Sequence, residues 1–516
     1  MALGWDSLSP YDRLVNTSLI EPRAYQINII KSIYTGGNTL VVLPTGLGKT
    51  LIAVFAMANA LHNGKKAVLL APTKPLSEQH HISLTRLLNI DPGHILLLTG
   101  SLGAESRARL EEEAKVIAAT PQTFANDLKK GRINLDGIGV VVFDEVHKAV
   151  GKYAYTYIAD ECKLKGVQLI GLTASPGSNR KKIDELIEAL GVENIEIRIS
   201  TDPDVEPYVM EKKVETIYVE PGKTVESIMA LLKPVIDEHL AKLYSYGLSP
   251  FKKSDGLSKG RILEIGRGID KLEAKNYKFM ALLHYVYLLH LSHAYDLVST
   301  EGLYPFMSYF DALNAKDKKS RALNSILTNG NVVMAIKTAK EALDRFEEHP
   351  KMEYIKWFIA NEMKGKNVIV FAQYRSTIKK LTDLLKGQDI NARSFVGKSQ
   401  GVTQEAQKST IDDFRKGKFN VLVSTSIGEE GLDIPSVDAV IFYEPVANEI
   451  RSIQRRGRAG RIKFGQVLIL VARKTKDEAY LMIARTREKR MRDLVMQIKG
   501  GIERGHTARS RQSMLK

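Results

Sequence analysis

The fold is decided by one stretch, residues 39–61, which reads TLVVLPTGLGKTLIAVFAMANAL. It begins with an apolar β-branched run, passes through a loop that contains Gly46 and Gly48, and ends in an apolar helical run. This strand–loop–helix order suits phosphate binding, because glycine lets backbone N–H groups approach the oxygens and a helix N-terminus favours negative charge. Leu43 stands where the usual pattern has its first glycine.

The polar residues of this loop have predictable roles. Lys49 is expected to reach the β- and γ-phosphates of a nucleotide, and the hydroxyl of Thr50 to bind Mg²⁺. Thr45, Gly46 and Gly48 complete the predicted phosphate cradle.

An acidic pair ends a second apolar run, at Val140 to Phe143. Asp144 is expected to hold Mg²⁺, and Glu145 to polarise the attacking water as a general base. The tetrapeptide alone could also be an ordinary helix start with a favourable acidic turn. Its place on a buried strand downstream of a phosphate loop favours the catalytic interpretation.

Short apolar runs recur through two parts of the chain, and continuous apolar runs are typical of parallel strands buried on both faces. The first group is 39–44, 66–72, 94–100, 115–120, 138–145 and 169–175, and the second is 367–373, 392–397, 419–425, 438–444 and 466–472. Between them, 222–348 has helical periodicity. The sequence predicts an α/β protein with two doubly wound parallel-sheet domains and an inserted α-helical domain. The expected ranges are 1–205, 206–348 and 349–483, followed by a basic helix or tail at 484–516.

Composition favours a globular protein that binds a polyanion. The 516 residues include 75 Lys and Arg against 59 Asp and Glu, a net charge of +16, which suits nucleic acid but also occurs in other basic proteins. One cysteine, Cys162, excludes a disulfide framework or a cysteine-based metal cluster. The histidines show no metal-binding spacing and are interpreted as core or surface residues. We expect no signal peptide and no membrane span, hence an intracellular protein, nucleoid-associated if prokaryotic.

Several motifs together resemble those of superfamily 2 helicases of the DEAH-like type. They are PTGLGKT (44–50), DEVH (144–147), TAS (173–175) and QRRGRAGR (454–461), in the order that this superfamily has them. The resemblance implies RecA-like ATPase domains that use ATP and Mg²⁺ and act on nucleic acid. It spans most of the chain apart from the insert and the tail.

Finer features narrow the resemblance to one branch. FAQYR (371–375), SIGEEGLDIP (426–435), FYEPV (442–446) and IRSIQRRGRAGR (450–461) are similar to the archaeal helicase-associated endonuclease for fork-structured DNA (Hef), the Fanconi-anaemia group M translocase and, more distantly, Dicer and antiviral RNA-sensor helicases. Val146 and Ala459 depart from the usual alanine and threonine. The relatives' nuclease motif is not recognised, so no nuclease activity is predicted.

The resemblance assigns further residues to sites, each with an ordinary structural alternative. Arg458 and Arg461 are expected to be arginine fingers, whose planar guanidinium groups suit a γ-phosphate, or else a basic surface loop or an anion site for nucleic acid. Strand-end hydroxyls would contact the nucleic-acid backbone, or act only as caps. Nucleotide contacts are expected at Gln26 (adenine), Gly431 and Asp433, nucleic-acid contacts at Thr73, Thr120 and Thr425, and coupling between the two sites at His147, Thr173, Ser175 and Gln454.

Two functions remain open from the sequence. The first is an ATP-driven helicase or translocase on duplex, forked or branched DNA, in replication-fork repair or recombination. The second is an ATPase directed to duplex RNA, of the RNA-sensor or Dicer-like kind. Lysine and arginine gather in the insert at 252–261 and 314–321, either to hold a second duplex arm or simply as solvated loops.

Overall fold

A computed structural model describes most of the chain. It covers residues 4–44, 46–100, 112–148, 154–174, 180–199, 202–208, 213–272, 275–396, 404–425, 437–445, 466–486, 489–490, 493–494 and 496–498. In this part of the chain, no helix is both long enough and apolar enough to cross a membrane.

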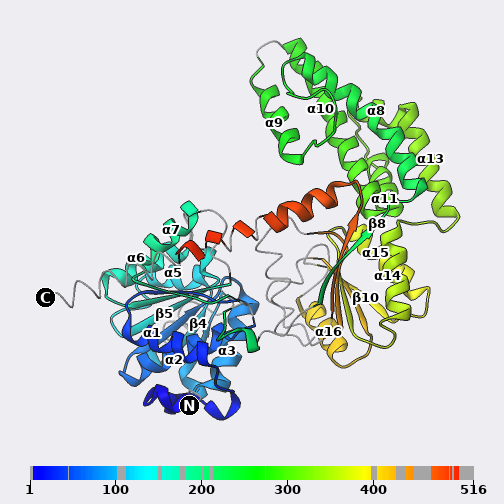
Figure 1. Cartoon of the computed structure of the whole chain (residues 1–516). Helices are drawn as coiled ribbons and strands as arrows, with labels where there is room; N and C mark the ends of the chain where they lie inside the picture. The colour runs from blue at the N-terminus through cyan, green and yellow to red at the C-terminus, as the bar shows by residue number, and fades with distance from the viewer. Residues whose placement is uncertain are drawn as a thin grey trace.

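The first lobe is built on a parallel sheet of seven strands in the order β3-β4-β2-β5-β6-β1-β7. The strands are β1 (Thr39–Val42), β2 (Lys66–Leu70), β3 (Ile95–Leu98), β4 (Val116–Ala119), β5 (Ile138–Asp144), β6 (Gln168–Thr173) and β7 (Asn194–Ile197). One face is covered by α1 (Ala24–Thr35), α2 (Lys49–His62) and α3 (Lys74–Leu87), and the other by α5 (Pro121–Lys129), α6 (Ala154–Leu164) and α7 (Arg180–Leu190) (Figure 1). Burial on both faces explains the apolar runs of the central strands.

The second lobe repeats this architecture with six parallel strands in the order β10-β11-β9-β12-β13-β8. They are β8 (Lys213–Val219), β9 (Val368–Phe371), β10 (Ala392–Phe395), β11 (Val421–Ser424), β12 (Ala439–Phe442) and β13 (Gln466–Ala472). Helices α14 (Pro350–Asn361) and α15 (Arg375–Lys386) pack on one face, and α16 (Gln404–Arg415) on the other. The predicted fold class of two parallel-sheet domains with a helical insert is therefore confirmed.

Strand β8 lies inside the range expected to be the helical insert, yet it pairs with β13 along seven residues and belongs to the second sheet. It is an edge strand, and its sequence KVETIYV mixes charged and apolar residues. Such a strand lacks the continuous apolar run of a central parallel strand, which is why the sequence pattern did not reveal it. The helical part begins only at Lys223.

A helical bundle, called the arm below, comes after the first lobe in the sequence. It projects from the second lobe (Figure 1). It consists of α8 (Lys223–Ser245), α9 (Lys259–Asp270), α10 (Lys275–Asp296), α11 (Leu303–Asn314), α12 (Arg321–Thr328) and α13 (Gly330–Asp344), with a π-helical turn, η7 (Leu297–Glu301), after α10. An apolar core of its own holds it together. The apolar stretch 279–295 lies in α10 and is only partly buried: Leu288 and Leu291 lie in the core, whereas Phe279, Met280 and Leu282 are exposed.

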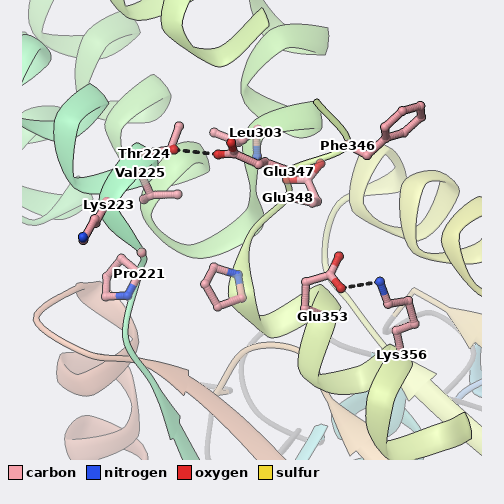
Figure 2. Close-up of a pocket in the computed structure, with 12 residues that line it drawn as sticks. Pro221, Lys223, Thr224, Val225, Leu303, Phe346, Glu347, Glu348, Glu353 and Lys356 are labelled. Atoms are coloured by element: carbon pink, nitrogen blue, oxygen red, sulfur yellow. Dashed lines mark hydrogen bonds and ion pairs between the residues drawn. The ribbon is translucent and has the colours of Figure 1, made fainter. Parts of the chain in front are cut away.

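The two chain crossings between the arm and the second lobe run side by side. Figure 2 shows them lining a cavity of about 440 Å³, between the start of α8 and the segment that joins α13 to α14. The hydroxyl of Thr224 donates to Glu347 Oε2 at 2.8 Å. Buried Glu348 accepts from the backbone N–H groups of Leu303 and Tyr304, and so caps α11. The root of the arm is thus fixed by both crossings.

A buried polar junction ties η7 to the second lobe. Lys351, on α14, is completely buried and forms an ion pair with Asp477, while its Nζ also donates to the carbonyl of Thr300 at 3.0 Å. The hydroxyl of Thr377, on α15, donates to Glu301 Oε2 at 2.9 Å. Burial raises the pKa of Glu301. These contacts join arm and second lobe through groups that are costly to separate.

The C-terminal segment crosses from the second lobe to the first. Leu481 packs in the second lobe's core, whereas Leu494 and Ile498 pack against the core between the first sheet and α5–α7. The crossing is visible as the last coloured segment of the chain (Figure 1). The range 484–516 was expected to be a basic helix or tail; its described part also serves as an apolar tie between the lobes.

We expect Lys351→Met to destabilise the second lobe by about 3–5 kcal/mol, because it leaves Asp477 as an uncompensated buried charge. The two tryptophans report on different lobes, Trp5 on the first and Trp357 on the second. Denaturant unfolding followed by Trp357 fluorescence, in a Trp5→Phe background, measures the effect. The double variant Lys351→Met/Asp477→Leu should recover most of the loss. Equal stability of all three proteins would show that the pair contributes nothing.

Candidate active site

The predicted nucleotide site lies at one edge of the first sheet. Strand β6 lies between β1, which leads into the phosphate loop, and β5, which ends at Asp144. Because all three strands are parallel, their carboxyl ends meet at the same edge. The register places Thr173, the last residue of β6, beside Val42 at the end of β1. The loop and the acidic pair are therefore close neighbours.

The phosphate loop has the backbone that its glycines allow. Gly46 and Gly48 both have φ of 85°, a left-handed conformation that favours glycine, and α2 begins at Lys49. A Cβ at Gly48 would lie 2.2 Å from Gln26 Nε2, so no larger residue fits without moving that side chain. Glycine at these two positions gives the loop the backbone conformation that a phosphate cradle requires.

Gln26 braces this loop from α1. Its Nε2 donates to the carbonyl of Leu47 at 3.0 Å, and the hydroxyl of Tyr25 donates to the same oxygen at 2.8 Å. Gln26 Oε1 is buried and has no hydrogen-bond partner among the described residues. An unsatisfied acceptor beside a phosphate loop suits the exocyclic amine of adenine, which supports the role expected of Gln26.

Lys49 is almost fully buried, and its Nζ donates to the carbonyl of Leu43 at 3.1 Å. The ammonium group is thus held over the loop by the residue that replaces the usual first glycine. Thr50 follows in the first turn of α2 and is half-buried. Both side chains therefore belong to the loop–helix corner where a nucleotide's phosphates and its Mg²⁺ would be held.

Both oxygens of the Asp144 carboxylate have protein partners. Oδ2 lies 2.7 Å from Nε2 of His80, on α3, and Oδ1 accepts from the backbone N–H of Glu145 at 3.0 Å. Each oxygen has a second lone pair, so the carboxylate can still face a metal-bound water. The sequence did not predict the contact of His80 with Asp144, because the two residues are 64 positions apart and no local spacing pattern indicates the contact.

Glu145 is held in an unusual conformation. Its φ is 50°, which is rare for a residue other than glycine and is often found where strain serves a site. Glu145 Oε2 lies 3.3 Å from His147 Nδ1, and the same nitrogen lies 3.2 Å from Thr173 Oγ1. His147 therefore bridges the expected general base to the end of β6, and the coupling role of His147 and Thr173 stays a prediction.

The three strand-end threonines occupy equivalent places. Thr73 follows β2 and precedes α3, Thr120 follows β4 and precedes α5, and Thr425 follows β11. The hydroxyl of Thr120 is 2.8 Å from that of Thr123. In the described part of the chain, the buried hydroxyls of Thr73 and Thr425 have no hydrogen-bond partner. Neither Thr73 nor Thr120 caps its helix through the side chain, and contact of the three with nucleic acid stays a prediction.

Several predicted site residues lie outside the described residues. They are Thr45, Ser175, Gly431, Asp433, Gln454, Arg458 and Arg461. Among the residues that are described, no group of three or more His, Cys, Asp or Glu side chains could hold a metal ion. A magnesium ion held by one carboxylate, a hydroxyl and nucleotide phosphates needs no such group, and the predicted use of Thr50 and Asp144 is of that kind.

Three protein-family models match the chain. The DEAD/DEAH box helicase model matches residues 23–183, and the helicase conserved C-terminal domain model matches 350–463. A helical-bundle model of ATP-dependent RNA helicases matches 224–344. These ranges fall in the first lobe, the second lobe and the arm.

A solved structure and curated relatives are also similar. The crystal structure of the Pyrococcus furiosus Hef helicase domain has a TM-score of 0.75 and 41% sequence identity, covering 91% of this chain and 99% of that one. A Methanocaldococcus jannaschii protein named as an ATP-dependent RNA helicase is 36% identical over 93% of this chain. The ATP-dependent DNA helicase mph1 of Neurospora crassa is 33% identical over 89% of it. The chain spans 62% and 41% of the lengths of these two relatives.

We expect Glu145→Gln to bind ATP as the parent does but to lose turnover by a factor of about 10²–10⁴, because it keeps the metal site and deletes the base. Lys49→Ala should instead lose nucleotide binding itself. Equilibrium binding of a fluorescent ATP analogue and a steady-state phosphate-release assay separate the two effects. Glu188→Gln, on the exposed face of α7, is the matched control. Turnover by Glu145→Gln within about tenfold of the parent would exclude Glu145 as the base.

Proposed function

Since the chain belongs to the DEAD/DEAH box helicase family, we propose that it is an ATP-dependent DNA helicase or translocase that acts on forked or branched DNA, in replication-fork repair or recombination. The observation that carries the proposal is the meeting of the phosphate loop, Asp144 and Glu145 at one sheet edge, in a chain with a second parallel-sheet lobe. The proposed place of action is intracellular, on DNA.

In the proposed mechanism ATP binds at the edge of the first lobe, and the second lobe completes the site. Lys49 holds the β- and γ-phosphates, Thr50 and Asp144 hold Mg²⁺, and Glu145 accepts a proton from the attacking water. Arg458 and Arg461 would stabilise the charge that spreads over the γ-phosphate oxygens. Binding would draw the lobes together, and hydrolysis would release them. Because the buried junction ties the arm to the second lobe, the arm moves with that lobe.

Similarity favours DNA over RNA as the substrate. Relatives that are named as ATP-dependent DNA helicases, such as mph1 of Neurospora crassa at 33% identity, support DNA, whereas one relative named as an RNA helicase is 36% identical. The helical-bundle model of RNA helicases, which matches the arm, keeps duplex RNA as the alternative. A protein distinguishes RNA from DNA by its contacts with the 2′-hydroxyl group, and sequence motifs do not show these contacts.

Two basic loops of the arm support a branched substrate. One lies between α8 and α9 and the other between α11 and α12. Burial, followed by the charges of Lys476 and Lys259, lowers the pKa of His293 to about 4, and burial with the charge of Lys316 lowers the pKa of His290. Lys259 and Lys316 thus both lie near α10. We propose that the two loops present cations to one duplex.

The nature of the nucleic acid is tested by ATPase activation. We expect forked DNA to raise the steady-state rate of hydrolysis most, linear duplex DNA less, and duplex RNA least. All three substrates should share one length and one salt concentration, since phosphate contacts depend steeply on salt. Stronger activation by duplex RNA than by any DNA would favour the alternative function.

The role of the arm is tested by neutralising its loops. Glutamine replaces eight residues together: Lys252, Lys253, Lys259, Arg261, Lys316, Lys318, Lys319 and Arg321. We expect a larger loss of affinity for forked DNA than for single-stranded DNA, a smaller dependence of affinity on salt, and unchanged ATPase activity without DNA. Lys337→Gln/Lys340→Gln, on the exposed face of α13, controls for net charge on the arm. Unchanged affinity and salt dependence on every branched substrate would leave the arm a scaffold.

A further inference from the structure

His80 lies outside every predicted role, yet it contacts the residue expected to hold Mg²⁺. We propose that His80 is a positioning residue, which fixes the carboxylate of Asp144 for Mg²⁺–nucleotide binding and ties it to helix α3. The inference rests on the proposed function, because it gives the ATP site one more working part. It adds to that function a contact that links the expected Mg²⁺ ligand, Asp144, to helix α3, which begins after Thr73.

The contact between His80 and Asp144 is a short, buried hydrogen bond. Nε2 of His80 is 2.7 Å from Oδ2 of Asp144, and both side chains are more than nine-tenths buried. An ionised carboxylate can only accept, so the proton of this bond lies on Nε2 of the histidine. The other oxygen of Asp144 is held by the N–H of Glu145. Partners on both oxygens leave the carboxylate no freedom to rotate, which is what a metal-binding carboxylate needs.

The backbone of Asp144 is fixed as well. The hydroxyl of Tyr155, on α6, donates to the carbonyl of Asp144 at 2.8 Å and lies 3.1 Å from the carbonyl of Leu70, at the end of β2. Helix α6 and strand β2 therefore hold the main chain, while α3 holds the side chain through His80. A change in α3 would act on the carboxylate without moving strand β5.

Helix α3 connects this contact to the expected nucleic-acid side of the lobe. Thr73 is the residue before its first turn, and His80 follows seven residues later, about 10 Å along the axis. Between them, fully buried Ser77 hydrogen-bonds back to the carbonyl of Thr73 at 3.2 Å. The helix is thus continuous and anchored between the two ends, so a shift at Thr73 is carried to His80.

The neighbouring histidine provides a matched control. His81 is on the same helix, but its Nε2 lies 3.0 Å from the carbonyl of Ile95, on β3. Its replacement also removes a hydrogen bond between a histidine of α3 and the rest of the lobe, but it leaves Asp144 alone. Two replacements of His80 by an amide side chain test whether the position of the donor matters or only the polarity of the side chain. The side-chain nitrogen of a glutamine would match Nε2 of the histidine, whereas an asparagine is too short to reach Asp144.

The test measures the Mg²⁺ concentration at which each protein reaches half-maximal binding of a fluorescent, non-hydrolysable ATP analogue, without nucleic acid. We expect His80→Ala and His80→Asn to need about 10–100 times more Mg²⁺ than the parent, as other losses of a carboxylate's hydrogen-bond partner do. His80→Gln should restore most of the affinity, and His81→Ala should match the parent. Affinity for the analogue in EDTA should stay the same in all five proteins, because Asp144 acts through the metal.

Three outcomes would overturn the proposal. An unchanged Mg²⁺ requirement in His80→Ala would show that Asp144 needs no support from α3. If His80→Gln and His81→Ala need as much additional Mg²⁺ as His80→Ala, the effect comes from the packing of the helix. If the parent itself binds the analogue without any dependence on Mg²⁺, the proposed function is wrong, and the role of His80 is wrong with it. If the parent depends on Mg²⁺ and the His80 variants do not differ from it, only the role of His80 is wrong.

Discussion

Lys351 is completely buried where the arm meets the second lobe; Asp477 neutralises its charge, and the carbonyl of Thr300 accepts a hydrogen bond from it. Separating these groups would leave a charge without water, so the junction stays closed through any motion that costs only a few kcal/mol. Among the described residues, this junction ties the arm to the second lobe. The first lobe is joined to that unit by the chain connections and by the C-terminal segment that packs Ile498 against it. In the proposed mechanism, a nucleotide would therefore move the first lobe relative to the second lobe and the arm together.

The first lobe organises its site as a row along one sheet edge. His80, Asp144, Glu145, His147 and Thr173 follow one another through short polar contacts, from α3 across β5 to the end of β6. One end of the row lies on the helix that begins after Thr73, and the other lies beside the strand that leads into the phosphate loop. Such a row would connect the proposed nucleic-acid contact at Thr73 with the proposed site of the γ-phosphate, because a shift of one buried side chain displaces its hydrogen-bonded neighbour.

Sequence reasoning succeeded where the signal is local. Strands β1 and β5 were predictable because burial on both faces demands continuous apolar residues, and the loop at Gly46 and Gly48 because its backbone demands glycine. It failed where the cause is tertiary. Edge strand β8 is half-exposed, so its mixed sequence resembled no buried strand. The partner of His80 is 64 residues away, and Ile498 is apolar within a basic stretch whose charge dominated its interpretation.

Distances between spin labels would show whether the arm and the second lobe move as one body when ATP closes the lobes. The only cysteine, Cys162, is buried, and burial raises its pKa to about 12, so it will not compete for a thiol-reactive label. Labels at Leu164 in the first lobe, Met334 on the arm and Trp357 in the second lobe use exposed positions. On adding a non-hydrolysable ATP analogue with forked DNA, we expect an unchanged distance from 334 to 357 and shifted distances from 164 to both. A change between 334 and 357, or no change from 164, would contradict motion as one body.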